Sequence, residues 1–318
     1  MSSEDLTLDR FLGGRVIAAQ PAKGFRAGHD TVLLAAAVPA GAGSVALELG
    51  SGAGVASLCL AARVPGARIV GIEIDPELVR LANENAARNG VADRVFFFTA
   101  DTSAFLPMAS NLDLSWPAKA GHPGDGGFRP GVGTFDHVFF NPPFHPYSAH
   151  ASPVGARDRA TRDSSDAIRS WTGRALSLVR DGGTVTAIVR ADRVHEILDE
   201  ARDSGGIVFP LFPRSGANPK RVIIRIIKTE RVSADAKFPI VLPSPLEGSR
   251  ADERQRSWRR PERAHRAAKQ RARGRKGGDA QANAGFATAA GLILHEADGR
   301  PTQAAEAVLR HAQALSFT

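Results

Sequence analysis

A glycine-rich turn between an apolar strand and a helix constrains this chain more than any other feature. The stretch LELGSGAG, Leu47 to Gly54, joins the apolar run at residues 44–50 to the run VASLCLAARV at residues 55–64. Glycine permits positive φ and close backbone approach, and the first N–H groups of a helix lack partners within that helix. A turn of this kind is typical of a ligand-binding βα unit in a parallel sheet.

Strand and helix patterns alternate around this turn, which indicates a parallel sheet with helices on both faces. The last two strands are split by the turn-rich stretch PRSGANPK, and no crossover helix can follow the second, because the sequence beyond it is turn-like and then basic. We therefore expect the two strands to form an antiparallel pair. The predicted fold is α/β: a doubly wound, seven-stranded, mostly parallel sheet with a C-terminal antiparallel hairpin. The strands are expected at residues 44–50, 67–74, 94–101, 135–140, 184–189, 206–212 and 221–229, and the helices at 29–38, 55–64, 76–90, 166–183 and 192–205.

Composition divides the chain into parts. Residues 1–242 are expected to form one domain, with a Gly- and Pro-rich insertion at about residues 107–134. Residues 243–290 have few large apolar side chains and are expected to be disordered. Residues 291–318 are expected to pack back on the first domain, with Thr302 capping a short helix.

The positive charge lies in one segment. Residues 250–276 hold twelve Lys and Arg against three acids, a net charge of +9, so the other residues carry −1 of the chain's total of +8. Because Lys and Arg side chains bind the phosphates of nucleic acids, this segment is a candidate for contact with RNA. The alternative is a solvated linker.

Other features narrow the class of protein. Cys59 is the one cysteine, so no intramolecular disulfide and no cysteine-based zinc site is expected. The N-terminal stretch MSSEDLTLDRF lacks the apolar core of a signal peptide, and no apolar run approaches the length of a membrane span. We therefore expect a cytoplasmic protein without membrane contact. Cys59 and Trp171 are interpreted as packing residues.

Three acids close consecutive predicted strands at the edge where such sheets bind ligands. Glu48 precedes the glycine turn, Glu73 can accept both hydroxyls of a ribose, and Asp101 can face an adenine. The spacing G-x-G-x-G, with Val55 at the third glycine of the dinucleotide fingerprint, disfavours NAD. An acid at Glu48 suits a cationic ligand such as S-adenosylmethionine better than a pyrophosphate. The alternative is a tight βα turn with helix-capping acids.

The stretch NPPF closes the fourth predicted strand. Pro142 biases Asn141 toward an extended backbone and offers no N–H donor, so oxygen atoms at this corner can only accept. The side-chain oxygen of Asn141 and the carbonyl of Pro142 can bind both hydrogens of an exocyclic amine. Pro143 continues this rigid corner, and Phe144 can stack on a base. The alternative is a proline-terminated strand with a core phenylalanine.

The pattern LELGSGAG…GIEID resembles the class I S-adenosylmethionine-dependent methyltransferases, and NPPF resembles the signature of amino-group methyltransferases. Together with GFRAGHDTVLLAAAV, PLFPRSGANPKRVIIR and LHEADGRPTQAAEAVLR, they resemble the tRNA1(Val) adenine-37 N6-methyltransferase family over about residues 1–240 and 291–310. The resemblance implies that the glycine turn holds the methionine part of the cofactor, Glu73 the ribose and Asp101 the adenine. The cofactor residues are then Arg26, Asp30, Glu48, Gly50, Ser51, Gly52, Gly54, Glu73, Ile74, Asp101, Thr102 and Asn141, and the catalytic residues are Asn141, Pro142, Pro143 and Phe144.

The expected substrate is the N6 amine of an adenine in tRNA. Guanine N2 in rRNA and a glutamine side-chain amide of a protein remain alternatives, because each is a conjugated amino group. A non-catalytic RNA-binding module on the same fold is a third possibility, although such a module has no need of NPPF and the acids together.

Overall fold

The computed structural model describes residues 5–24, 26–102, 135–142, 164–229 and 285–317, with side chains of the first helical residues 164–166 left aside. Both the insertion at 107–134 and the basic segment at 250–276 lie outside these residues. The described residues belong to one compact unit, formed by residues 1–230 and 284–318.

The central sheet has nine strands among the described residues, in the order β10-β8-β9-β7-β6-β3-β4-β5, with β11 also paired to β8. The strands are β3 (Val45–Leu49), β4 (Arg68–Glu73), β5 (Val95–Thr99), β6 (Phe135–Phe140), β7 (Val179–Arg190), β8 (Gly205–Arg214), β9 (Arg221–Ile227), β10 (Phe286–Thr288) and β11 (Leu292–His295). The helices around it are α1 (His29–Ala37), α2 (Val55–Arg63), α3 (Pro76–Arg88), α5 (Ser164–Leu178), α6 (Val194–Glu200) and α9 (Gln303–Leu309), with a 3-10 turn η3 (Ala191–Arg193) before α6.

All seven predicted strands form, and the predicted fold class is confirmed. Strands β3 to β7 pair in parallel, whereas β9 is antiparallel to both β7 and β8. Two helix ends were wrong, because α5 ends at Leu178 rather than at residue 183 and α6 ends at Glu200 rather than at residue 205. Gly182 and Gly183 instead extend the β7–β9 ladder, with Gly182 N donating to Lys228 O at 2.8 Å and Lys228 N donating to Gly183 O at 3.0 Å.

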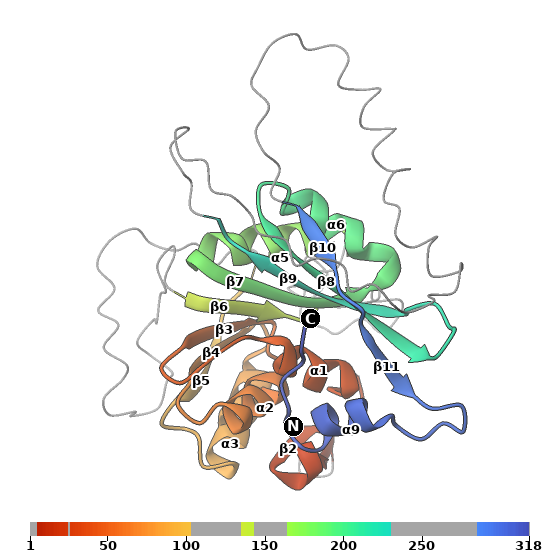
Figure 1. Cartoon of the computed structure of the whole chain (residues 1–318). Coiled ribbons are helices and arrows are strands. Elements are labelled where there is room, and N and C mark those ends of the chain that lie inside the picture. The colour runs from red at the N-terminus through yellow and green to blue at the C-terminus, as the bar shows by residue number, and fades with distance from the viewer. Residues whose placement is uncertain (1–4, 25, 103–134, 143–163, 230–284, 318) are drawn as a thin grey trace. The chain divides into compact units, whose positions relative to one another are not determined.

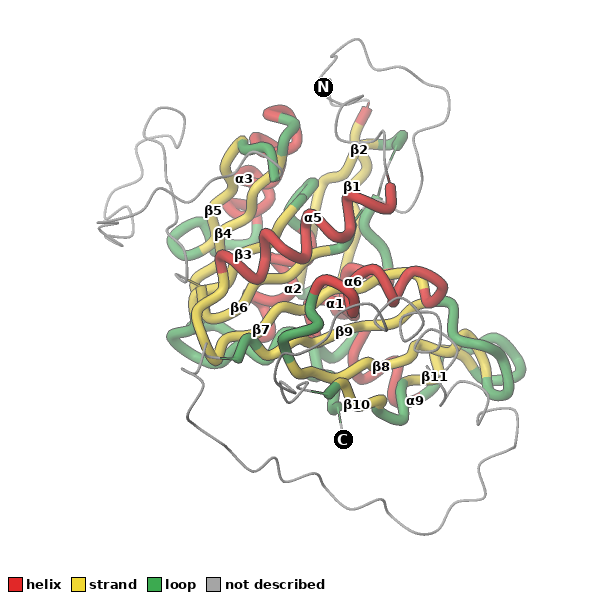
Figure 2. The backbone as a smooth tube through the Cα atoms, turned by 90° about the horizontal axis from the view of Figure 1, so that it is seen from above, coloured by secondary structure: helices red, strands yellow, loops and turns green. Residues whose placement is uncertain are grey.

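Helices cover both faces of the sheet (Figures 1 and 2). Helices α1, α2 and α3 pack on one face and α5 and α6 on the other, and each face has its own apolar core. Successive strand residues alternate between the two cores: Phe139 joins the first and Phe140 the second. This burial on both faces explains why the strands read as continuous apolar runs.

An N-terminal hairpin, which the sequence analysis did not anticipate, packs beside the sheet. Strands β1 (Leu6–Phe11) and β2 (Val16–Pro21) pair in antiparallel fashion around the 3-10 turn η2 (Leu12–Gly14). Two asparagines of α3 hold β2 by its backbone. Asn85 accepts from Ala19 N at 2.8 Å and donates to Ala19 O at 2.9 Å, and Asn89 makes the same pair of bonds to Ile17.

The C-terminal segment returns to the sheet edge. Strand β10 lies within the range 243–290 that was expected to be disordered, so that expectation was wrong for its last residues. Strands β10 and β11 form their backbone hydrogen bonds by pairing with β8. Their sequences are too short to indicate a strand without this pairing. Thr302 caps α9 as predicted, accepting from Ala305 N at 3.1 Å. At the chain end, the Phe317 ring lies 4.8 Å from that of Phe209 and 3.8 Å from the guanidinium of Arg225.

We predict that Asn85→Ala destabilises the protein by about 1–3 kcal/mol for each buried backbone group that loses its partner. Asn85 is fully buried and also donates to Ala53 O in the glycine turn at 3.0 Å. Chemical denaturation measures the change. Glu84→Ala, on the exposed side of the same helix, is the control and should change the free energy of unfolding by less than about 0.5 kcal/mol. Equal effects of the two substitutions would contradict this role of Asn85.

Candidate active site

Most of the predicted site residues that the structure describes lie at the carboxyl edge of four neighbouring parallel strands, β6, β3, β4 and β5. Strand β3 lies between β6 and β4, with Leu49 opposite both Phe140 and Ile72. The chain therefore leaves β3 at Gly50 beside the point where it leaves β6 at Asn141. Glu73, at the end of β4, borders the glycine turn from the other side.

The three glycines of the turn have different roles, although all have positive φ. A Cβ at Gly50 would lie 2.5 Å from Cη2 of Trp171, and one at Gly54 would lie 2.6 Å from Cζ of Phe97. A Cβ at Gly52 would meet no atom within 4 Å. Gly50 and Gly54 are therefore required for packing, and Gly52 is the glycine that faces open space, where a ligand can approach the backbone.

Glu73 fixes the conformation of the glycine turn. Its Oε2 accepts from Gly52 N at 2.9 Å, and its Oε1 accepts from Ile74 N at 2.9 Å and from Asp75 N at 3.2 Å. A carboxylate accepts about four hydrogen bonds, so one further acceptor position is left. To bind both hydroxyls of a ribose, Glu73 has to release one of these backbone groups.

Glu48 is buried, with 4% of its surface exposed. Its Oε2 accepts from Ser57 N at 3.0 Å and from Ser57 Oγ at 2.5 Å, so it caps the first turn of α2. Burial, with a smaller effect of the Glu73 charge, raises the pKa of Glu48 to about 8, against the hydrogen bonds from Ser57 that lower it. A cationic ligand group nearby would favour the ionised form of Glu48 and so cause the carboxyl group to release its proton.

Two polar atoms of the predicted site are buried without a hydrogen-bond partner among the described residues. They are Oδ1 of Asn141 and Oγ of Ser51. Buried acceptors normally have donors, so these two atoms are candidates for contact with a ligand. Pro142 is buried beside Asn141, whereas Pro143 and Phe144 lie outside the described residues.

The remaining predicted residues divide into two groups. Ile74 and Asp101 are half-buried and Thr102 is buried, close to the ends of β4 and β5. Arg26 and Asp30 are engaged in ion pairs, Arg26 with Asp9 at 2.7 Å and Asp30 with Arg221 at 2.8 Å. The N-cap position of α1 is Gly28, and Asp30 is the acid in the first turn of this helix.

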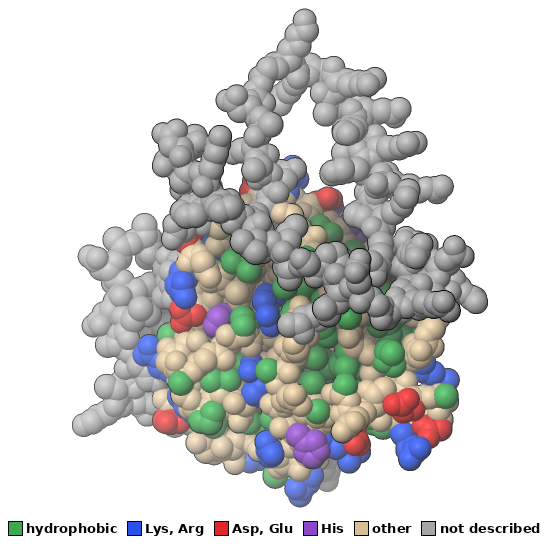
Figure 3. Space-filling view, in the orientation of Figure 1, with side chains coloured by type: hydrophobic (Ala, Val, Ile, Leu, Met, Phe, Trp, Pro, Cys, Tyr) green, Lys and Arg blue, Asp and Glu red, His purple; other side chains and the backbone are tan. Residues whose placement is uncertain are grey.

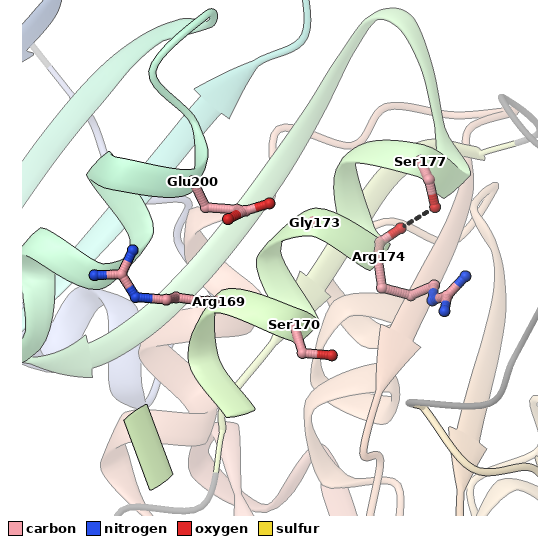
Figure 4. Close-up of a pocket in the computed structure, with 6 residues that line it drawn as sticks. All are labelled: Arg169, Ser170, Gly173, Arg174, Ser177 and Glu200. Atoms are coloured by element: carbon pink, nitrogen blue, oxygen red, sulfur yellow. Dashed lines mark hydrogen bonds between the residues drawn. The ribbon is translucent and has the colours of Figure 1, made fainter. Parts of the chain in front are cut away.

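A pocket of about 320 Å³ lies elsewhere, lined by residues of α5 and the last residue of α6 (Figure 4), and it includes no predicted site residue. It is lined by Arg169, Ser170, Gly173, Arg174, Ser177 and Glu200. The carboxylate of Glu200 lies against Gly173, where a Cβ would be only 2.8 Å from Oε1. In the part of the chain that the structure describes, no group of three or more His, Cys, Asp or Glu side chains is placed to hold a metal ion. No helix in the same residues is long and apolar enough to cross a membrane.

Comparison with known families agrees with this geometry. Residues 40–144, which run from the entry to β3 through the NPPF stretch, match the family described as a methyltransferase domain. The chain carries a methyltransferase domain. A tRNA1(Val) (adenine(37)-N6)-methyltransferase of Porphyromonas gingivalis strain W83 is 33% identical over 176 residues, which are 54% of this chain and 61% of that protein. One of Bacteroides thetaiotaomicron is 29% identical over 203 residues, 63% of this chain and 75% of that protein.

The methyltransferase domain also resembles proteins with other names. A release factor glutamine methyltransferase of Chlorobaculum tepidum is 27% identical over 158 residues, 48% of this chain and 47% of that protein. The structure of a protein described as a predicted O-methyltransferase from Agrobacterium tumefaciens matches 90% of this chain and 98% of its own with a TM-score of 0.54 and 19% identity. This confirms the class I methyltransferase fold. S-adenosylmethionine is the cofactor of this class, as predicted, and the predicted similarity to the tRNA adenine enzymes is confirmed.

We predict that Gly52→Val and Gly50→Ala of the methyltransferase domain fail in different ways. Both place a side chain at positive φ, at a cost of about 1–2 kcal/mol. Gly52→Val should lower the affinity for S-adenosylhomocysteine at least tenfold, because its side chain fills open space. Gly50→Ala should chiefly lower the melting temperature, because its Cβ collides with Trp171. Calorimetry and thermal melting distinguish them, and unchanged affinity in Gly52→Val would contradict the assignment of this space to the cofactor.

We also predict that Glu48→Gln flattens the dependence of stability on pH. A carboxyl whose pKa rises from 4.5 to about 8 on folding holds a proton that the unfolded chain has released. The free energy of unfolding therefore falls between these pH values, by at most about 1.4 kcal/mol per pH unit. Denaturant titrations at pH 5, 6.5 and 8 measure this slope. Glu84→Gln, on an exposed helix face, should keep it; a Glu48→Gln protein with the original slope would show that Glu48 ionises normally.

Proposed function

We propose that this chain is an S-adenosylmethionine-dependent methyltransferase that modifies the N6 amine of an adenine in tRNA. The observation that carries the proposal is the buried Oδ1 of Asn141, which lacks a hydrogen-bond donor among the described residues. It lies at the end of β6, next to the glycine turn that follows β3. An acceptor in this position is suited to an N–H group of a substrate.

The residues around the turn fit the cofactor. Gly52 borders open space, and the buried hydroxyl of Ser51, in the same turn, has no hydrogen-bond partner among the described residues. Glu73 and Glu48 supply carboxylates for the ribose and for the cationic methionine end. When bound, S-adenosylmethionine supplies an electrophilic methyl group on a sulfonium.

Asn141 and Pro142 orient the substrate amine. The Asn141 Oδ1 and the Pro142 carbonyl oxygen accept its two hydrogens, which turns the nitrogen lone pair, otherwise delocalised into the ring, toward the methyl group. The nitrogen becomes acidic once it has a positive charge, so no strong base is needed. Catalysis by these residues is positioning and charge stabilisation. Phe144 is proposed to stack on the base.

Lys and Arg side chains are needed to bind the phosphates of an RNA backbone. The folded part of the chain offers few of them for this purpose. On the face seen in Figure 3, Lys and Arg side chains are dispersed among acidic ones. Several arginines near the carboxyl edge are engaged by acids: Arg26 by Asp9, Arg190 by Asp192, Arg193 by Glu196 and Arg221 by Asp30. Arg214, at the end of β8, and Lys220, in the turn before β9, are exposed. We propose that these two residues and the basic segment 250–276 meet the phosphates, and that a tRNA substrate places the enzyme in the cytoplasm.

A glutamine side-chain amide is the second candidate substrate. The similarity to the release factor glutamine methyltransferase favours it, and Asn141 and Pro142 would accept the two amide hydrogens in the same way. Guanine N2 is chemically close to adenine N6 and is therefore an outcome of the same test.

We predict that the wild-type protein transfers label from S-adenosylmethionine to unmodified tRNA, and that digestion yields N6-methyladenosine. Asn141→Ala should reduce single-turnover methylation at least a hundredfold, because the amine loses an orienting acceptor. Its affinity for S-adenosylhomocysteine should stay within a few-fold. Asn141→Asp, which keeps the acceptor geometry but adds a charge, is the matched variant.

Separate pools of rRNA and release factor are the controls. Label appearing as N2-methylguanosine in rRNA, or only in protein, would overturn the tRNA substrate and leave the methyltransferase proposal standing. A near-normal single-turnover rate for Asn141→Ala would overturn the role of NPPF.

A further inference from the structure

The side chain of Trp171 connects two parts of the proposed active site. Trp171 lies in the middle of α5, is half-buried and packs at the border of the core between α5 and the sheet. Helix α5 links the parallel strands β6 and β7, so it runs opposite to them and its first turns lie toward their carboxyl ends. Side chains tilt toward the N-terminus of their helix, and the indole therefore leans toward the edge that holds the site.

The first contact of the indole is with the glycine turn. Its six-membered ring lies so close to Gly50 that a Cβ there would be 2.5 Å from Cη2 and 3.0 Å from Cζ3. The ring thus covers Gly50 from the α5 face and restricts where this residue can move. Gly50 is also the point where the chain turns from β3 toward Gly52.

The second contact is with the residue before Asn141. The rings of Trp171 and Phe140 meet edge to face, with centroids 6.0 Å apart and an interplanar angle of 71°. Aromatic pairs favour this arrangement over a face-to-face sandwich, so the pair has a preferred geometry. Phe140 is fully buried and forms the last residue of β6.

These two contacts reach the elements that hold the methyl donor and the methyl acceptor. Leu49 and Phe140 are paired neighbours on β3 and β6, so Gly50 and Asn141 leave the sheet side by side. The indole of Trp171 touches both Gly50, where the glycine turn begins, and Phe140, the residue before Asn141. A displacement of about 1 Å between reacting groups can reduce a rate about a hundredfold.

We propose that Trp171 is a positioning residue that fixes the glycine turn relative to Asn141. It acts through Gly50 and Phe140 and touches neither the methyl group nor the amine. The inference rests on the proposed function for its catalytic consequence, whereas its effect on the glycine turn is independent of the methyl acceptor. A branched aliphatic side chain would fill much of the same volume without the edge-to-face geometry.

The test compares Trp171→Leu, Trp171→Phe and Leu178→Ala. Leu178 is fully buried in the same core and on the same helix, so it controls for loss of packing. Trp171→Leu should reduce the single-turnover methylation rate at saturating cofactor and RNA about 10- to 100-fold, with a smaller change in the KM for RNA. Trp171→Phe should recover most of the rate. Leu178→Ala should lower the melting temperature at least as much as Trp171→Leu and, below its melting range, methylate within about threefold of wild type. A Trp171→Leu rate within twofold of wild type, or equal rate losses in Trp171→Leu and Leu178→Ala, would overturn the proposal.

A second readout needs no methyl acceptor. The chain has three tryptophans, and replacing Trp116 and Trp258, which lie outside the described residues, by Phe leaves Trp171 as the sole indole. Addition of S-adenosylhomocysteine should change the emission of this variant, with the same Kd that calorimetry gives. Unchanged emission at saturation would overturn the proposal. If wild type binds S-adenosylhomocysteine but methylates no acceptor tested, the proposed substrate fails while the emission result still decides the role of Trp171.

Discussion

The carboxyl end of β3 is held from both faces of the sheet, and the rest of the site depends on this constraint. Trp171 covers Gly50 from the face of α5, and Phe97 covers Gly54 from the face of α2. Glu73 binds the Gly52 N–H between them. The turn is thus fixed at Gly50, Gly52 and Gly54. The space beside Gly52 stays open because these three contacts hold the backbone in place. A preformed cradle of this kind reduces the ordering cost when a ligand binds.

The polar groups of the site are also arranged before any ligand arrives. A buried acceptor without a donor costs about 1–3 kcal/mol, and among the described residues Asn141 Oδ1 has no donor. The apolar burial around β3 and β6 offsets this cost in free energy, because the neighbouring strands are buried on both faces of the sheet. Violations of ordinary packing rules that persist in a well-packed fold are expected where function requires them.

Much of the fold could be predicted, because the alternation of apolar strands and helices is a local property of the sequence. The N-terminal hairpin could not, since β2 is held by the side chains of Asn85 and Asn89 on α3, and no periodicity reveals such a contact. The alternating stretch LTLDRF and the Gly13-Gly14 pair were the available signals. Strand β10 was missed for a similar reason: three residues are too few for a pattern, and pairing with β8 stabilises them.

The strand topology was enough to predict where Glu48 and Glu73 lie. The pKa of Glu48 depends on burial, which the sequence does not show. Sequence reasoning placed Glu48 and Glu73 at the ends of β3 and β4, and the sheet brings both to the glycine turn. Glu73 is half-buried and accepts hydrogen bonds from three backbone N–H groups. Glu48 is buried against Ser57, and its raised pKa favours a neutral carboxyl until a cation approaches. Two glutamates on adjacent strands therefore respond differently to the same ligand: its cationic group should release a proton from Glu48, and its ribose hydroxyls should replace a backbone N–H group at Glu73.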